Sequence, residues 1–162
     1  MKHTVVGVDV AKNVFQVHWV EPETGEIVSK KIKRADFLTH FANRAPCLIG
    51  MEACGGAQHW ARQLTKMGHQ VKLMPGKAVK AFVVGNKNDV ADARAIWTAV
   101  QQPGIKAVAV KTEEQQAVLA LHRMRQQLVK FRTINWLRVF PAIEFVCNPQ
   151  PAAVVGKRHA MS

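Results

Sequence analysis

Four acidic residues stand where an ordinary solvated charge would be unusual. Asp9 and Glu52 each end an apolar, strand-like run, and Asp89 and Asp92 stand three residues apart at the start of a helical pattern. A carboxylate at the end of a buried strand costs free energy unless a partner compensates for its charge. The carboxyl ends of strands are also where open α/β sheets bind their ligands. These positions make all four acids candidates for chemistry.

Together the four acids predict a divalent-metal site. The i, i+3 spacing puts Asp89 and Asp92 on one face of a helix, and Asp9 would lie beside Glu52 if their strands are parallel neighbours. Carboxylates crowded in this way repel one another unless a cation neutralises them. Magnesium prefers hard oxygen ligands, and two such ions about 3.5–4 Å apart assist phosphodiester transfer. We therefore predict that these four residues are catalytic and bind Mg²⁺, with Mn²⁺ as an alternative.

Three of the acids also have a structural interpretation. Asp89 could cap its helix, and Asp92 could simply favour the positive helix end. Glu52 could pair with a nearby Lys or Arg. Any one acid could have such a structural role. A coincidence that places all four acids at such positions is much less expected.

The charge balance favours a polyanionic partner. Lys and Arg total 23 against 11 Asp and Glu, which gives a net charge of +12. Each phosphate that a cation neutralises releases condensed counterions, although a merely solvated basic surface is the alternative. Two lysines flank the acids, and four cations lie off the apolar stripe of a late helix. The predicted nucleic-acid-binding residues are thus Lys12, Lys87, Arg123, Arg125, Lys130 and Arg132.

Composition limits the class of protein. At 162 residues and 48% apolar content, the chain suits one compact domain with a real core. No apolar run approaches the length of a membrane span and no signal peptide opens the sequence, so we expect a cytoplasmic protein without a membrane partner. The three cysteines share no metal-ligand spacing and are expected to be reduced and mostly packed.

The order of elements predicts an α/β fold. Three short strands should form an antiparallel meander, and two later strands alternate with helices. That order matches an RNase H-like mixed five-stranded sheet, ordered 3-2-1-4-5, with flanking helices. The expected strands are 4–10, 13–20, 26–33, 46–52 and 71–74, with a brief one at 107–110; the expected helices are 37–44, 56–67, 77–84, 89–102 and a long one capped by Thr112.

These elements divide the chain into three parts. We predict an RNase H-like catalytic domain at residues 1–111, a long basic helix at 112–137 and an irregular tail at 138–162. The long helix has one apolar stripe, formed by Val118, Leu121, Met124 or Leu128, and Phe131.

Three motifs resemble those of a known family. Gly7–Lys12, Gly50–Gly56 and Lys87–Ala93 look like the motifs of DEDD insertion-sequence transposases of the IS one-ten group, and Gly68–Pro75 and Val79–Phe82 fit the same pattern. The match covers roughly residues 4 to 133, in order and at sensible spacing.

The resemblance implies a function. The chain would be the N-terminal catalytic domain of a bacterial transposase, nucleoid-associated, whose RuvC-like site performs metal-dependent phosphodiester cleavage and strand transfer in DNA. The four metal-binding acids would be Asp9, Glu52, Asp89 and Asp92. The family also implies a C-terminal domain with a nucleophilic serine, a structured RNA from its own element, and homo-oligomers around DNA, formed here through the long helix.

The sequence departs from that pattern after about Arg132. Three prolines interrupt the tail, which we interpret as a truncated or frameshifted end, with a short cap that folds back as the alternative; they are Pro141, Pro149 and Pro151. Neither Ser29 nor Ser162 matches the family nucleophile. A non-catalytic module for nucleic-acid binding or oligomerisation is therefore the rival function. A sugar-kinase-like ATPase would need a second phosphate hairpin and a longer chain.

Overall fold

The computed structural model describes residues 4–85 and 88–147, with side chains up to residue 135. The chain divides into two compact units, Met1–Lys111 and Thr112–Ser162, which are treated separately below. None of the described helices combines the length and the apolar content needed to cross a bilayer.

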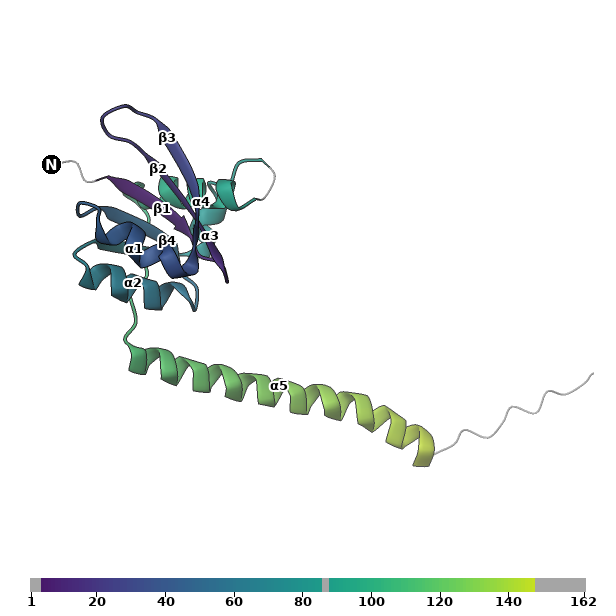
Figure 1. Cartoon of the computed structure of the whole chain (residues 1–162). Helices are drawn as coiled ribbons and strands as arrows, with labels where there is room; N and C mark the ends of the chain where they lie inside the picture. Colours follow the sequence, from purple (N-terminus) through teal and green to yellow (C-terminus); the bar gives the residue numbers. More distant parts are fainter. Residues whose placement is uncertain (1–3, 86–87, 148–162) are drawn as a thin grey trace, which may run out of the picture. The chain divides into compact units, whose positions relative to one another are not determined.

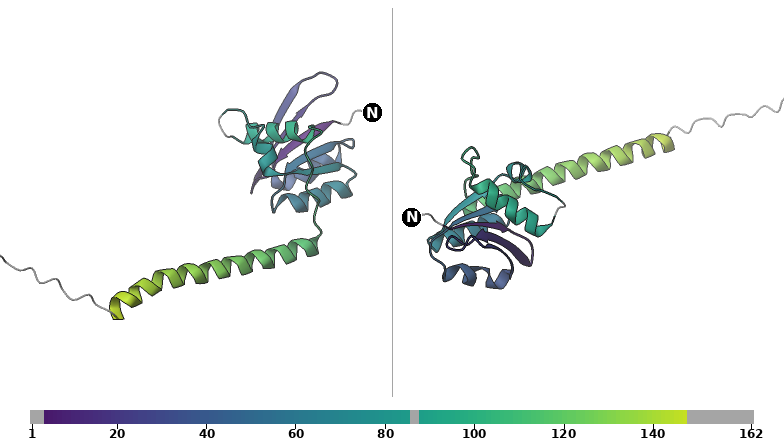
Figure 2. Two further views of the ribbon diagram at one scale, coloured as in Figure 1. Left: turned by 180° about the vertical axis from the view of Figure 1, so that it is seen from behind. Right: turned by 90° about the horizontal axis from the view of Figure 1, so that it is seen from above.

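The first unit is built on a mixed five-stranded sheet (Figures 1 and 2). The strand order is β3-β2-β1-β4-β5, as predicted for an RNase H-like fold. β1 pairs antiparallel with β2 and β2 with β3, whereas β1 and β4, and β4 and β5, are parallel. The strands are β1 Val5–Asp9, β2 Val14–Val20, β3 Ile27–Lys33, β4 Leu48–Glu52 and β5 Gln70–Met74.

The helices of this unit largely follow the predicted order. They are the 3-10 helix η1 Arg34–Asp36, α1 Phe37–Ala42, α2 Ala57–Lys66, α3 Gly76–Lys80 and α4 Asp89–Val100. The brief strand predicted at 107–110 does not form. Val108 makes only an isolated antiparallel bridge to Leu73, with its N–H donating to the Leu73 carbonyl at 2.7 Å. The short run of β-branched residues had indicated a strand, but it meets the sheet at a single residue.

One face of the sheet packs on α1 and α2 through aromatic rings. Phe15 of β2 makes edge-to-face contacts with Phe37 of α1 and Trp60 of α2, with ring centroids 4.7 and 5.2 Å apart. Phe15 and Phe37 are fully buried, and Val6 and Val8 of β1 belong to the same apolar cluster. Such pairs add attraction beyond their buried area. This face therefore forms the main hydrophobic core.

The opposite face is covered by α4 at unusually close range. A Cβ atom on Gly7 would lie 2.4 Å from the Ala93 carbonyl oxygen and 2.6 Å from the Trp97 amide nitrogen. At Gly50 it would lie 2.9 Å from the Val100 Cβ. Glycine at position 7 lets the α4 backbone rest directly on β1, and glycine at position 50 leaves room for the Val100 side chain over β4. This close packing fixes where α4 begins relative to the ends of β1 and β4.

A buried histidine fastens α2 to the sheet. After α2, Gly68 adopts a positive φ of 91°, which glycine tolerates without strain. His69 follows, with its Nδ1 accepting from the Cys47 N–H at 3.3 Å and its Nε2 lying 3.2 Å from the Phe41 carbonyl oxygen. The Gly68–His69 pair of the resemblance is thus explained by structure. Burial raises the pKa of the Cys47 thiol, whereas Cys54 is exposed, contrary to the expectation of packed cysteines.

The second unit is the helix α5, Glu113–Cys147. Thr112 caps it as predicted: its Oγ1 accepts from the Gln115 N–H at 3.2 Å, and its own N–H donates to Gln115 Oε1 at 3.1 Å. Residues 138–147, predicted to be irregular, are helical. The helix continues through Pro141, although a proline inside a helix removes one N–H donor and crowds the carbonyl four residues before it. The rest of the predicted tail, 148–162, lies outside the described residues.

Candidate active site

Asp9 and Glu52 lie at the ends of two adjacent parallel strands. β1 and β4 are in register up to the pair Val8 and Met51, so Asp9 and Glu52 occupy the next position along each strand. Side chains alternate between the two faces. Asp9 therefore shares the α4-covered face with Gly7, and Glu52 shares it with Gly50. Both carboxylate residues are half-buried, and the juxtaposition predicted from the sequence is present.

A row of side chains, four of them polar, crosses the sheet at this level. Asp9 pairs with Gln16 of β2, and Gln16 pairs with Lys31 of β3. On the other side Glu52 pairs with Met74 of β5. Residues paired across strands project from the same face. On the face of the sheet that α4 covers, the row therefore consists of Lys31, Gln16, Asp9, Glu52 and Met74.

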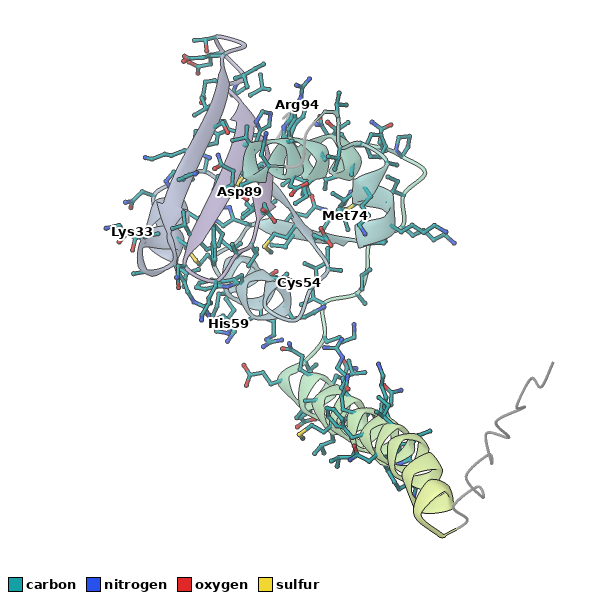
Figure 3. The ribbon with its side chains drawn as sticks, turned by 90° about the vertical axis from the view of Figure 1, so that its right-hand side faces the viewer. Lys33, Cys54, His59, Met74, Asp89 and Arg94 are labelled. Carbon is teal, nitrogen blue, oxygen red and sulfur yellow. The ribbon has the colours of Figure 1, made fainter. Side chains whose placement is uncertain are left out.

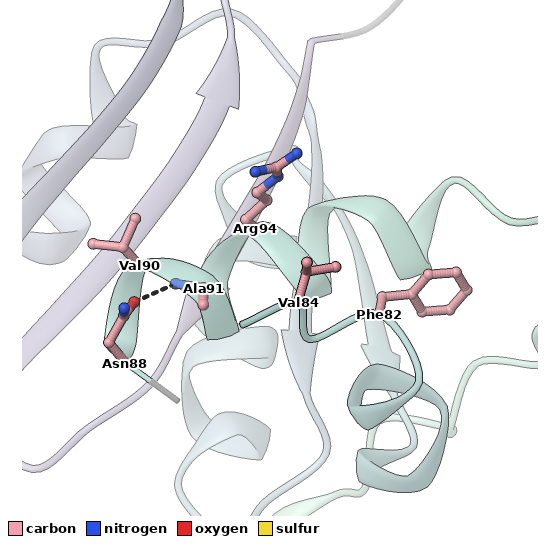
Figure 4. Close-up of a pocket in the computed structure, with 6 residues that line it drawn as sticks. All are labelled: Phe82, Val84, Asn88, Val90, Ala91 and Arg94. Carbon is pink, nitrogen blue, oxygen red and sulfur yellow. Dashed lines mark hydrogen bonds between the residues drawn. The ribbon is translucent and has the colours of Figure 1, made fainter. Parts of the chain in front are cut away.

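The other two acids stand in the first turn of α4. Asn88, not Asp89, is the capping residue: its Oδ1 accepts from the Ala91 N–H at 2.7 Å (Figure 4). The alternative in which Asp89 caps the helix is thus wrong. Asp92 precedes the buried Ile96 by four residues, so it extends the sheet-facing stripe of α4 toward the helix start. Asp92 is half-buried, and Asp89 is exposed. Figure 3 labels Asp89 at the start of α4.

Glu52 occupies a space that Gly76 leaves open. A Cβ atom on Gly76, the first residue of α3, would lie 2.6 Å from Glu52 Oε1 and 3.3 Å from its Cδ. The chain is held at this place by the Ala53 N–H, which donates to the Met74 carbonyl at 2.8 Å. A side chain at position 76 would therefore displace the carboxylate. No pattern in the sequence indicated this role for Gly76.

Asp9 and Glu52 are neighbours at the strand ends and Asp89 and Asp92 share the first turn of α4, but the described acids do not form a finished metal cluster. Across residues 4–85 and 88–147, as far as side chains are described, no three His, Cys, Asp or Glu residues are placed to hold one ion together. The expectation that three of the acids already share a metal-sized site is not met by these side-chain positions. Carboxylates repel one another, so drawing them closer requires a cation between them. What the fold supplies is the arrangement of strand ends and helix start.

A cavity of about 260 Å³ lies beside the first turn of α4 (Figure 4). Its walls are largely apolar, with the Arg94 guanidinium at one side. Its lining consists of Phe82, Val84, Asn88, Val90, Ala91 and Arg94. None of the four acids belongs to that lining, so this cavity is not the carboxylate site.

Comparison with known proteins decides the family. The DEDD transposase family of IS110 type, described as "Transposase", matches residues 6–139. The chain belongs to this transposase family. A probable family 20 transposase of Pseudomonas aeruginosa is 45% identical over 128 residues, which is 79% of this chain and 38% of that protein.

Two further transposases are similar over most of the chain. The transposase for insertion sequence element IS1328 of Yersinia enterocolitica is 39% identical over 155 residues, 94% of this chain and 46% of that protein. The transposase for IS1111A of Coxiella burnetii is 41% identical over 136 residues, 83% and 37% respectively. The chain thus spans less than half the length of these relatives.

A neutral histidine lies under α4 in this transposase chain. His18 is 4% exposed, its ring is 5.6 Å from that of Trp97, and its Nδ1 has no partner among the described residues. Burial, and then the charge of Arg94, lower the pKa of His18 below its ordinary value. Both effects favour the uncharged form of the imidazole. Sequence reasoning had not singled it out.

The predicted nucleic-acid-binding residues fall on both units. Lys12 is exposed in the turn between β1 and β2, where its carbonyl oxygen accepts from Arg34 Nη1 at 3.3 Å. Lys87 lies outside the described residues. The four cations of α5 are exposed and make two rows, each with residues seven apart: Arg123 with Lys130, and Arg125 with Arg132.

The apolar stripe of α5 is also exposed. Its side chains are 53 to 69% accessible. They are Val118, Leu121, Met124, Leu128 and Phe131. A soluble helix that leaves such a stripe uncovered is typical of an interaction surface.

Proposed function

We propose that this chain is a metal-dependent catalytic domain for DNA transposition, in which Asp9, Glu52, Asp89 and Asp92 hold Mg²⁺, or Mn²⁺, against a DNA phosphate. The observation that carries the proposal is the placement of Asp9 and Glu52 on neighbouring parallel strand ends, on the face where α4 begins with the other two acids. The donor set fits the ion, because magnesium prefers carboxylate oxygens and keeps water ligands for a phosphate.

The residues would divide the chemistry between them. When bound, the ions would stabilise charge on the attacking and leaving oxygens of the phosphodiester. The rigid strand ends fix Asp9 and Glu52, whereas Asp89 and Asp92 complete the site from the first turn of α4. Lys12 would contact the DNA backbone beside the acids. Neutral His18 adds no cation that would compete with the metal.

The α5 helix would serve DNA and a second copy of the chain. Its two basic rows suit phosphate backbones, and its apolar stripe suits the same stripe of another copy, since apolar residues spaced three and four apart support helix pairing. We propose a homo-oligomer through α5. The resemblance adds an element-encoded structured RNA as a further proposed partner.

Complete strand transfer is proposed to need more than this chain. Metal ions stabilise charge but do not choose the attacking oxygen, which must be positioned separately. The family resemblance assigns that nucleophile to a second domain, and the matched relatives are more than twice as long. We expect metal binding and DNA binding from this chain, with weak or no strand transfer.

Loss of the Asp9 carboxylate tests the metal site. Magnesium should raise the melting temperature of the wild type, since a ligand at 100 times its Kd stabilises by about 2.7 kcal/mol. Asp9→Asn should lose most of that rise. Asp36→Asn, which removes an exposed acid next to α1, should keep it. Equal magnesium responses in both variants would refute the site.

Charge reversal on α5 tests the DNA surface. DNA binding should weaken steeply with salt, and Arg125→Glu with Arg132→Glu should reduce the slope of log K against log salt. The control is Lys66→Glu with Lys106→Glu, which changes net charge equally at exposed positions of the first unit. Unchanged slopes in the α5 variant would exclude this face.

A non-catalytic binding module is the second candidate. The uncovered α5 stripe and the lack of a finished metal cluster among the described residues favour it. Metal-dependent cleavage of branched and duplex DNA by the wild type, lost in Asp9→Asn, would decide for the catalytic domain. DNA binding that is unaffected by metal and by Asp9→Asn, without cleavage, would decide for the module.

A further inference from the structure

Gln16 is a buried polar residue beside Asp9. It is 4% exposed, and it is the cross-strand partner of Asp9 in the β1–β2 ladder. Side chains paired in this way project from the same face with Cβ atoms about 4.5–5.5 Å apart. The Gln16 amide therefore lies within the layer between the sheet and α4, next to the first of the four acids.

Only one end of that amide has a partner. Gln16 Nε2 donates to Ser29 Oγ of β3 at 2.8 Å. Gln16 Oε1 is buried and has no hydrogen-bond partner among the described residues. The two ends of a planar amide point apart, so the bond to Ser29 leaves Oε1 on the side away from that residue. A buried acceptor without a donor is costly, and it calls for an explanation such as an ion or a water.

We infer that Gln16 is a positioning residue of the metal site, whose Oε1 accepts a hydrogen bond from a water ligand of the ion held by Asp9. This inference rests on the proposed function. Magnesium retains several water ligands, which are donors. Outer groups that accept from first-shell ligands orient them and tune metal affinity. A neutral amide does so without adding a further negative charge to four carboxylates.

The competing explanation is purely structural. Gln16 could serve only to connect β2 with β3 through Ser29. In that case removing the Ser29 hydroxyl should have the same effect as removing the Gln16 amide. If Oε1 acts on the metal site instead, the two variants should differ.

Metal affinity measured without DNA separates these cases. Mn²⁺ binding is followed by the loss of the free-ion EPR signal in the wild type, Gln16→Met, Gln16→Glu, Ser29→Ala and Asp9→Asn. Gln16→Met keeps the length of the side chain and removes the acceptor, so affinity should fall about 10-fold or more. Gln16→Glu keeps an acceptor and should bind at least as tightly as the wild type. Ser29→Ala should stay close to the wild type.

The outcomes are distinct for the inference and for the proposed function. Wild-type affinity in Gln16→Met, with affinity lost in Asp9→Asn, would overturn the role of Gln16 alone. Equal losses in Ser29→Ala and Gln16→Met would also overturn it, in favour of the structural link. Affinity retained in Asp9→Asn would refute the metal site itself. If Gln16→Met fails to fold without metal, Gln16→Glu and Ser29→Ala decide: a loss in the former, or a comparable loss in the latter, overturns the inference.

Discussion

The two faces of the sheet pack against their helices in different ways. Under α1 and α2, large rings such as Phe15 and Trp60 fill the space between sheet and helices. Under α4 the sheet offers Gly7, on which the helix backbone rests, and Gly50, which the Val100 side chain covers. The polar residues of the sheet that are buried, Gln16 and His18, lie on the α4 side in the part of the chain that the structure describes. The first face stabilises the domain, and the second carries the proposed metal site.

This difference separates stability from metal response. A substitution on the aromatic face should lower the free energy of unfolding and leave the magnesium-dependent increment intact. A substitution under or beside α4 should reduce the magnesium-dependent increment even where it changes the free energy of unfolding only slightly. Three substitutions and a comparison of two histidines test the division.

Phe15→Ala should have the largest effect on stability. Phe15 is fully buried and contacts both Phe37 and Trp60, so truncation should cost about 3–5 kcal/mol. Urea unfolding with and without magnesium measures both quantities. Val14→Ala, at a 41% exposed position of the same strand, should cost far less. If the magnesium increment disappeared in Phe15→Ala while the protein stayed folded, the two faces would not be independent.

Gly7→Ala should have the second-largest effect on the free energy of unfolding. Its Cβ would meet backbone atoms of Ala93 and Trp97, which cannot rotate away, so α4 must shift at a cost of about 1–3 kcal/mol. The shift should also reduce the magnesium increment, because α4 carries two of the acids. Gly50→Ala meets only the Val100 side chain and should be milder in both respects. The reverse order would show that α4 is not held by its contact with β1.

Gly76→Ala should affect stability least while weakening metal binding. Its Cβ would meet Glu52 Oε1, the far end of a side chain that can rotate, and alanine favours a helix over glycine by roughly 0.5–1 kcal/mol. Unfolding free energy should therefore be unchanged or slightly higher, whereas the magnesium-induced shift in melting temperature falls. A normal magnesium shift in this variant would show that Glu52 does not need its observed position.

The sequence predicted the parts of the site that depend on position along the chain. Apolar runs that end in Asp9 and Glu52 are visible without a structure, as is the i, i+3 spacing of Asp89 and Asp92. The roles of Gln16 and Gly76 depend on strand register and on a contact between distant segments, which no local pattern records. The strand expected at 107–110 failed for the same reason: a strand exists only where a partner lies beside it.

His18 and His40 offer the finest comparison of the two faces. His18 lies under α4, and His40 lies against Trp19 on the α1 side. Burial lowers the pKa of both below 6.5, assisted by Arg94 for His18, and by Arg44 and Lys30 for His40.

The pH dependence follows from the sign of those shifts. Because the folded-state pKa is the lower one, the unfolded chain binds protons more readily as pH falls below 6.5, and each histidine then lowers the free energy of unfolding. Stability from this source is complete above pH 6.5 and is lost as pH falls toward the folded-state pKa. His18→Gln and His40→Gln should each flatten part of that slope, as measured by urea unfolding above and below pH 6.5. Since His18 lies on the face of the acids, magnesium should alter the slope in the His40→Gln variant, which retains His18, more than in His18→Gln. An identical magnesium effect in both variants would show that the charge state under α4 is independent of the metal site.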